Sequence, residues 1–463
     1  MLGLFGTLDL ASRSLATQQE GTAVAGQNMA NVNNPAYARE RTVVQTSAPL
    51  ETTAGEEGTG ADVVSITEVR DSLLDSQIQS ENSATGSFTA QQSALQNAEA
   101  CLGEQLTNSG ASAASTDGLA AKLSNLFNSF SSLTTGAGDP AAVVQSAQMV
   151  ATQFNQVSAN LSQVRGNLNL SIQNDVASSN QDLKDIAALN QQIVLAEAGG
   201  GTANDLVDER QQKIEDLASM MNFSTVAQPN GSVDLSVGTD KLVTGGTVDD
   251  HLQAYDAGGG QLVVHNCAGL QLPLTGGSIA GNITARDGAL AGLQTSLNTL
   301  ASQLITQVNN IYSAGYDSNG GTGRDFFTGI GASDIAVNSG LVADPSQFQA
   351  SSVAGAGGNT RIALALANLA TQDNPALGNQ SIPQRYAQTV STLGNAIDAA
   401  TDQLNTSQAI GATLANHRSS ESGVSIDEEM TNLMQFQKAY EASAKLVTTL
   451  NAMMETVINM KTA

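Results

Sequence analysis

Apolar residues recur at alternating spacings of three and four near both ends of the chain. One stripe runs through residues 4–32 and the other through residues 426–458. This spacing places the apolar side chains on one face of a helix, and that face must be buried against another surface. We expect the two helices to pack against each other or against neighbouring subunits. The residues expected at this assembly interface are Leu4, Leu8, Ala11, Leu15, Met29, Val32, Leu433, Phe436, Tyr440, Val447, Leu450, Met454 and Val457, with Ile426, Met430, Gln437, Ala444 and Ile458 continuing the C-terminal stripe.

Longer stripes predict helices in the middle of the chain. Asp139 and Pro140 form an N-cap followed by proline at the first helical position, and the apolar rhythm then continues to about residue 197. A helix over 140–197 would be about 85 Å long at about 1.5 Å per residue. Further helices are expected over 290–311, over 386–414 after Ser381-Ile382-Pro383, and near 71–107, 116–133 and 205–221. They are expected to pack side by side in a rod-like bundle.

The segment 222–283 has a different pattern. Val233, Leu235 and Val237 alternate as in a strand, and the turn sequence Pro229-Asn230-Gly231 precedes them. This pattern predicts a small β domain inserted into the rod and dispensable for the rod fold, because the two ends of an inserted domain usually lie close together. The Gly-, Ser- and Asn-rich region 313–380 is expected to be loop with short elements.

The predicted fold is therefore mainly α, with an inserted small β domain and discontinuous domains. Residues 1–40 with 422–463 would form a terminal coiled-coil assembly domain. Residues 41–221 with 284–421 would form the long helical bundle, and 222–283 the inserted β domain.

The net charge and the composition limit which classes of partner the chain is expected to bind. The formal net charge is −25, from 43 acidic and 18 basic residues, which opposes binding to nucleic acid or to an anionic membrane. No apolar run reaches the length of a membrane span. A cleaved secretory signal is not expected, because no basic residue precedes Arg13 and no apolar h-region follows. Cys101 and Cys267 are too few for a disulfide framework, and a bond between them is not expected.

The sequence shows no pattern typical of a catalytic, cofactor or metal site. His251, His265 and His417 do not form a His-Glu-x-x-His motif, and the chain contains no Cys-x-x-Cys, P-loop, nucleophile elbow or dinucleotide fingerprint. The carboxylate pairs Asp249-Asp250 and Glu428-Glu429 are better explained by solvation and, for the second, by a capping box that starts at Ser425. No enzyme activity, cofactor or metal is expected.

One glycine-rich segment resembles a calcium-binding repeat. Residues 320–328 fit a single copy of a nonapeptide that normally binds calcium in stacked copies, and Asp317 begins a loop with Thr328 where a calcium loop has an acidic residue. A tight turn followed by a buried Phe326-Phe327 pair is the better interpretation.

The segment from Asn28 to Arg39 resembles the N-terminal motif of the flagellar axial proteins, the family of rod, hook and hook-associated proteins. That motif reads roughly Asn-x-Ala-Asn-x-Asn-Thr-Pro-Gly-Tyr-Ser-Arg, and the chain departs from it at Asn34, Ala36 and Ala38. Pro-Gly suits a type II turn, whereas Pro35-Ala36 favours type I. The matching residues are Asn28, Ala30, Asn31, Asn33, Pro35, Tyr37 and Arg39.

Two more segments carry the resemblance. The C-terminal region is similar to the C-terminal motif of the family, with Ser425 and Ser443 where asparagine is usual. The segment 204–210 is similar to an internal segment of the hook-associated proteins of this family. The C-terminal motif residues are Ser422, Gly423, Val424, Asp427, Glu428, Glu429 and Gln437.

The resemblance implies a structural junction protein that forms an adaptor ring between the hook and the filament of a bacterial flagellum. The implied partners are the hook protein below, a second hook-associated junction protein above, copies of the chain in the ring, and a cytoplasmic export chaperone on the C-terminal helix. It also implies type III export and an extracellular location in the flagellum. The same C-terminal face, including Tyr440, is expected to bind the chaperone and later to pack on the N-terminal helix around Leu8, Leu15 and Met29. The alternatives are a hook or rod subunit, whose middle should be mainly β, or an exported cell-wall hydrolase.

Overall fold

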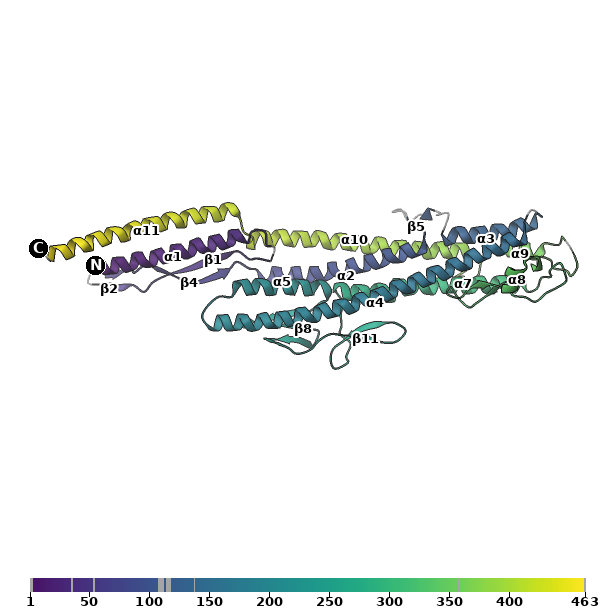
Figure 1. The fold of residues 1–463 in the computed structure, drawn as a ribbon, viewed down its shortest axis with the longest axis horizontal. Coiled ribbons are helices and arrows are strands. Elements are labelled where there is room, and N and C mark those ends of the chain that lie inside the picture. Colours follow the sequence, from purple (N-terminus) through teal and green to yellow (C-terminus); the bar gives the residue numbers. More distant parts are fainter. Residues whose placement is uncertain are drawn as a thin grey trace.

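The chain forms an elongated rod that is mainly helical, with both termini at the same end (Figure 1). The computed structural model describes residues 3–34, 36–52, 55–106, 112–113, 118–136, 138–356 and 358–461. The helices are α1 (Leu4–Ala30), α2 (Ser72–Leu102), α3 (Leu119–Thr134), α4 (Pro140–Ala198), α5 (Asn204–Met220), α6 (Gly277–Ala285), α7 (Ala291–Tyr312), α8 (Ser339–Ala343), α9 (Arg361–Asn368), α10 (Ile382–Ser422) and α11 (Ile426–Lys461). The strands are β1 (Glu40–Thr46), β2 (Leu50–Thr52), β3 (Gly55–Glu57), β4 (Ala61–Glu68), β5 (Gln105–Leu106), β6 (Ser112–Ala113), β7 (Ser224–Ala227), β8 (Val233–Val237), β9 (Asp240–Thr244), β10 (Thr247–Val248), β11 (Gln253–Asp256), β12 (Leu262–His265), β13 (Phe327–Thr328) and β14 (Ala336–Val337).

The predicted long helices are confirmed, and local capping sets where they begin. The Asp139 side chain accepts a hydrogen bond from the Ala141 backbone N–H at 2.9 Å, and α4 then continues for 59 residues. Ser381 and Gln384 form a complete capping box at the start of α10. The helices near 71–107, 116–133 and 205–221 are confirmed as α2, α3 and α5, although residues 107 and 116–117 lie outside the described residues.

The larger hydrophobic core lies where α3, α4, α7, α9 and α10 meet, at the end of the rod far from the termini (Figure 1). Tyr312, Phe326 and Phe348 form edge-to-face ring contacts with centroids 5.2–6.0 Å apart. Phe326 and Phe327 are fully buried, which confirms the predicted aromatic pair. The region 313–380 consists of loops and short elements, as predicted, but its apolar side chains complete this core.

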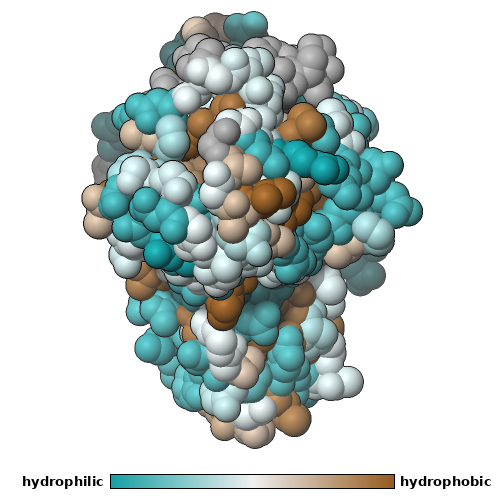
Figure 2. All heavy atoms as spheres, turned by 90° about the vertical axis from the view of Figure 1, so that its right-hand side faces the viewer, coloured by the Kyte–Doolittle hydropathy of each residue, from teal (hydrophilic) through white to brown (hydrophobic). Residues whose placement is uncertain are grey.

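The outer surface at this end is mostly hydrophilic. Figure 2 looks along the rod at the end opposite the termini and shows small, separate hydrophobic areas on a polar surface. Exposed apolar side chains in this part of the chain are Ile330, Val342, Val353 and Leu364. Among the described helices, none is both long and apolar enough to cross a membrane.

The predicted β insert is present and packs on α4. It contains a four-stranded antiparallel sheet in the order β10-β9-β8-β7 and a β11–β12 hairpin, and Figure 1 shows it alongside α4. A second core unites Leu235 and Val243 of the sheet with Ile172 and Leu183 of α4. The insert therefore covers apolar surface of the rod, which argues against its being dispensable. Residues 277–283, assigned to the insert, belong instead to α6.

Strands along α1 were not predicted. β1 and β4 form an antiparallel pair from Glu40↔Glu68 to Thr46↔Ala61, and both contact α1. The predicted domain boundaries place residues 41–68 in the helical bundle. β1 is largely polar and exposed, and β4 is mostly half-buried with adjacent valines, so neither strand has the clear apolar alternation by which strands are recognised.

The terminal helices α1 and α11 pack against each other, as predicted. Gly21 of α1 allows a close approach, because a Cβ atom at this position would lie 2.7 Å from the Phe436 ring. Ser14 and Ser443 share a hydrogen bond of 2.9 Å across the interface. Leu450, only 6% exposed, is the most buried apolar residue of α11.

One part of the predicted α11 stripe does not face α1. Tyr440 and Val457 are 42% and 55% exposed, and Met430, Gln437 and Ile458 are exposed as well. Leu433, Phe436, Val447, Leu450 and Met454 are better covered. Apolar residues at spacings of three and four can fit more than one face of a helix. Sequence alone therefore did not distinguish the face of α11 that contacts α1 from a slightly rotated one that includes Tyr440. Tyr440 is thus only partly covered in the single chain, and its packing on α1 around Leu8, Leu15 and Met29 in an assembly stays a prediction.

Candidate functional site at the joint of the rod

All three segments that resemble flagellar axial proteins meet at one place, where the terminal helices join the rod (Figure 1). We call this place the joint and define it as residues 28–40, 68–75, 204–210 and 418–429. It connects α1, α11 and the β1–β4 pair with α2, α5 and α10. The joint is the candidate functional site because it connects the predicted assembly helices to the rod.

Asn28, at the end of α1, organises the N-terminal motif. Its side chain is 1% exposed and accepts hydrogen bonds from the Tyr37 hydroxyl at 2.8 Å and from the Glu40 backbone N–H at 2.9 Å. The amide nitrogen of Asn28 donates to the Glu40 carbonyl at 2.9 Å. A single amide thus satisfies both backbone groups of Glu40, which requires the donor and acceptor that asparagine has on one side chain. Burial raises the pKa of Tyr37, so its hydroxyl stays protonated as a donor.

The turn after α1 is consistent with the substitution of alanine for glycine. The Tyr37 N–H donates to the Asn34 carbonyl at 3.2 Å. Among the described residues other than glycine, only Asn379 has a positive φ, so Ala36 does not have the conformation of a type II turn. Pro35, a residue of the predicted motif, lies outside the described residues.

Arg39 connects the N-terminal motif to the C-terminal motif. Its backbone N–H donates to the Ser422 carbonyl at 2.8 Å, and its guanidinium pairs with Glu428 at 2.6 Å. Between α10 and α11, a Cβ atom at Gly423 would lie 2.2 Å from the Ser419 carbonyl oxygen, so only glycine fits this turn. One half of the predicted capping box is present, because the Glu428 N–H donates to the Ser425 hydroxyl at 3.5 Å.

Arg70 forms the centre of the joint. Its guanidinium pairs with Glu68 at 3.0 Å, with Asp75 at 3.2 Å and with Asp208. The Asp208 carboxylate also accepts the Ala38 backbone N–H, at 3.3 Å from each oxygen. Strand β4, helix α2, helix α5 and the N-terminal motif are thereby attached to one side chain.

Burial is the main influence on the pKa values of the joint's carboxylates, which outnumber its central cation. Burial raises the pKa of Asp208 to about 7; the charge of Glu68 adds to this effect and Arg70 opposes it. Burial also raises the pKa values of Glu68 and Asp75. Burial alone would lower the pKa of Arg70, but the surrounding carboxylates raise it. Arg70 therefore stays charged, and Asp208 is the group best placed to take up a proton near neutral pH.

The internal segment 204–210 connects the joint to the rest of the rod. Asn204 donates to the Glu40 carboxylate at 2.7 Å, next to the Asn28 contacts. Arg210 donates to the Asn190 side chain at 2.8 Å and to the Gly231 carbonyl at 2.7 Å, which joins α5 to α4 and to the β insert. Burial lowers the pKa of Arg210 to about 10, so it remains a cation at neutral pH.

Several predicted motif residues do not contribute side-chain contacts in the joint. Ala30, Asn33, Asp427 and Gln437 are exposed. In contrast, the matched motifs do not include Glu68, Arg70 or Asp75, and they assign Asp208 no individual role. A glutamate two residues before an arginine is a common pattern, so no specific signal pointed to this cluster.

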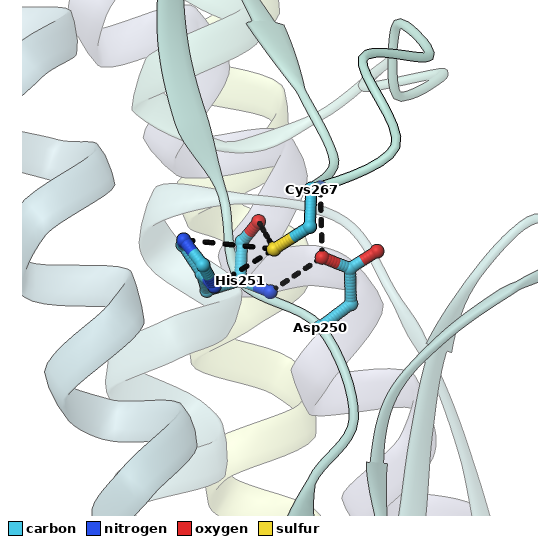
Figure 3. Close-up of side chains that lie close together, drawn as sticks. All are labelled: Asp250, His251 and Cys267. Carbon is cyan, nitrogen blue, oxygen red and sulfur yellow. Dashed lines mark hydrogen bonds between the residues drawn. The ribbon is translucent and has the colours of Figure 1, made fainter.

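A second group of side chains was also missed, in the β insert. Asp250, His251 and Cys267 have possible metal-ligand atoms within 4.8 Å of one another (Figure 3). No fixed metal-ligand motif in the sequence contains this group, because it forms only when two loops meet. Cys101 and Cys267 are both free thiols.

Comparisons with known proteins identify the family. Residues 103–327 match the model of the flagellar hook-associated protein FlgK helical domain, and residues 416–460 match the model of the flagellar basal body rod FlgEFG protein C-terminal region. The first region contains α3 to α7 and the β insert, and the second contains the C-terminal motif.

Curated relatives match over nearly the whole chain. Flagellar hook-associated protein 1 of Bacillus subtilis is 28% identical, with 99% of each chain covered. The Escherichia coli protein of the same name is 23% identical, with 97% of this chain and 99% of the relative covered. A solved structure of the flagellar hook junction protein FlgK from Burkholderia pseudomallei has a TM-score of 0.62 and 16% identity, and it covers 75% of this chain and all of the other, which confirms the mainly helical fold. The chain belongs to the flagellar hook-associated protein 1 (FlgK) family of structural flagellar proteins, which are not enzymes.

Proposed function

We propose that the chain forms an adaptor ring between the hook and the filament of the bacterial flagellum. The observation that carries this proposal is the similarity, over nearly the full length of both chains, to relatives named hook-associated protein 1. The solved structure with the same fold is described as a hook junction protein. The role is mechanical: α1 and α11 would contact neighbouring subunits, and the joint would transmit load from these helices into the rod.

The proposed partners are the hook protein below, a second hook-associated junction protein above, and copies of the chain within the ring. Helix α11 supports such contacts, because it leaves many apolar side chains without cover in the single chain. Many exposed apolar side chains along one helix are typical of an interaction surface. The exposed residues are Ile426, Met430, Met434, Tyr440, Leu446, Met453, Val457, Ile458 and Met460.

The same face would need cover before export, so a cytoplasmic export chaperone is also proposed to bind α11 as a helix in a groove. Tyr440→Asp would place a charge on this face without disturbing the buried contact with α1. We expect this substitution to weaken chaperone binding in titration calorimetry and to prevent motility. Normal binding together with normal motility would contradict one surface serving both partners.

Deletion of the gene tests the junction role. We expect cells with complete hooks, no filaments, and flagellin released into the medium. A plasmid copy should restore filaments, and a copy without residues 426–461 should not. Cells that lack complete hooks would indicate a hook or rod subunit instead, and filaments in the deletion strain would contradict any essential axial role.

A further inference from the structure

The Asp250, His251 and Cys267 side chains lie at the surface of the β insert and are not part of the joint. Asp250 and His251 follow β10, whereas Cys267 follows β12. Figure 3 shows the three side chains converging from these two loops. Their possible ligand atoms all lie within 4.8 Å of one another, and the His251 and Cys267 side chains are accessible from solvent.

Backbone hydrogen bonds hold the two loops in this arrangement. The Asp250 carboxylate oxygen Oδ1 accepts the His251 N–H at 2.7 Å and the Cys267 N–H at 2.8 Å. A single carboxylate therefore bridges the loops and points toward the thiol. The fold therefore sets the backbone positions of the three residues and the orientation of the Asp250 carboxylate.

The distances are suitable for a tetrahedral ion. Cys267 Sγ lies 2.9 Å from His251 Nδ1 and 3.5 Å from Nε2. With metal bonds of about 2.3 Å to sulfur and about 2.0 Å to nitrogen, a tetrahedral ion would separate these two ligand atoms by about 3.5 Å. A small rotation of the exposed His251 imidazole would bring its Nδ1 atom to this distance from Cys267 Sγ.

We propose that Asp250, His251 and Cys267 form a Zn²⁺ site with one position left for water. A thiolate, an imidazole and a carboxylate are the three ligand types that zinc uses in proteins. Binding replaces the thiol proton, which is released to solvent. The bound ion would join the β10–β11 loop to the turn after β12 and so stabilise the insert against α4.

The arrangement does not suit a reactive cysteine–histidine pair. The Asp250 carboxylate lies against the thiol and raises the pKa of Cys267, whereas a nucleophile needs a lowered pKa. Burial acts to raise the pKa of Asp250, but hydrogen bonds from Cys267 and from the His251 N–H lower it, so the carboxylate is available as an anionic ligand.

The test uses the full-length chain, reduced and freed of metal with a chelator. Titration with zinc chloride should show one ion bound per chain, and Co²⁺ should give the sulfur-to-cobalt charge-transfer absorption of a thiolate ligand. Cys267→Ser and His251→Gln should each weaken zinc binding by at least about tenfold. The control Cys101→Ser removes the other thiol and should leave zinc affinity unchanged.

Circular dichroism of each variant checks that the fold is intact, and sedimentation in the presence of zinc checks that the chain remains monomeric. Unchanged affinity in Cys267→Ser or His251→Gln would overturn the proposal. So would the absence of zinc binding, or one ion bound between two chains. Because the readout is metal binding by the isolated chain, its failure would leave the proposed junction role untouched.

Discussion

Asp208→Asn should remove a large part of the pH dependence of stability. Asp208 is 6% exposed and accepts hydrogen bonds from Arg70 and from the Ala38 backbone. Asparagine has nearly the same shape and keeps an oxygen for the Ala38 N–H, but it does not titrate. The substitution therefore isolates the charge of Asp208 from its packing.

The sign and size of the effect follow from the pKa values. Burial raises the pKa of Asp208 from 3.8 to about 7 in the folded chain. Between these two values the folded state holds a proton that the unfolded state has lost, so stability is greatest at low pH and falls as the pH rises through 7. From pH 5 to pH 8 this one group should lower the free energy of unfolding by about 3 kcal/mol, at about 1.36 kcal/mol per pKa unit.

Urea unfolding of the wild type and of Asp208→Asn at pH 5 and pH 8 measures this effect. The stability of the wild type relative to the variant should decrease by about 3 kcal/mol between these pH values. Asp216→Asn is the matched control, because Asp216 is an exposed carboxylate on the same helix, α5. A difference between wild type and Asp208→Asn that stays constant, or that grows with pH, would refute the reasoning.

Three further results are expected. Arg70→Met should destabilise the chain by about 3–5 kcal/mol in urea unfolding, because it leaves buried carboxylates without their cation, whereas Met at the exposed Arg41 should have little effect. Phe326→Ala should cost about 3–5 kcal/mol by opening a cavity in the core, and Ala at Ile330, which is 84% exposed, is its control. Replacement of 224–275 by a Gly/Ser linker should lower the calorimetric melting temperature of the rod, because the linker would expose the apolar face of α4; an unchanged melting curve would show that the insert folds separately.

Sequence alone determined the helices and the family motifs. Asp139-Pro140 and Ser381 mark where α4 and α10 begin, because capping depends on residues adjacent in the chain. The apolar spacing also predicted the lengths of these helices, because every residue of a stripe belongs to the same helix. The pairing of α1 with α11 also followed from the sequence, because each terminal stripe needs a partner.

Tertiary structure alone decided how these elements meet. Arg70 and Asp208 are 138 positions apart, and Arg39 and Glu428 are 389 apart, so no local pattern records that they pair. The rotation of α11 that leaves Tyr440 exposed depends on which face fits against Gly21 of α1. These contacts arise from the path of the whole chain, because charge pairing and close packing require positions in space that sequence spacing does not specify.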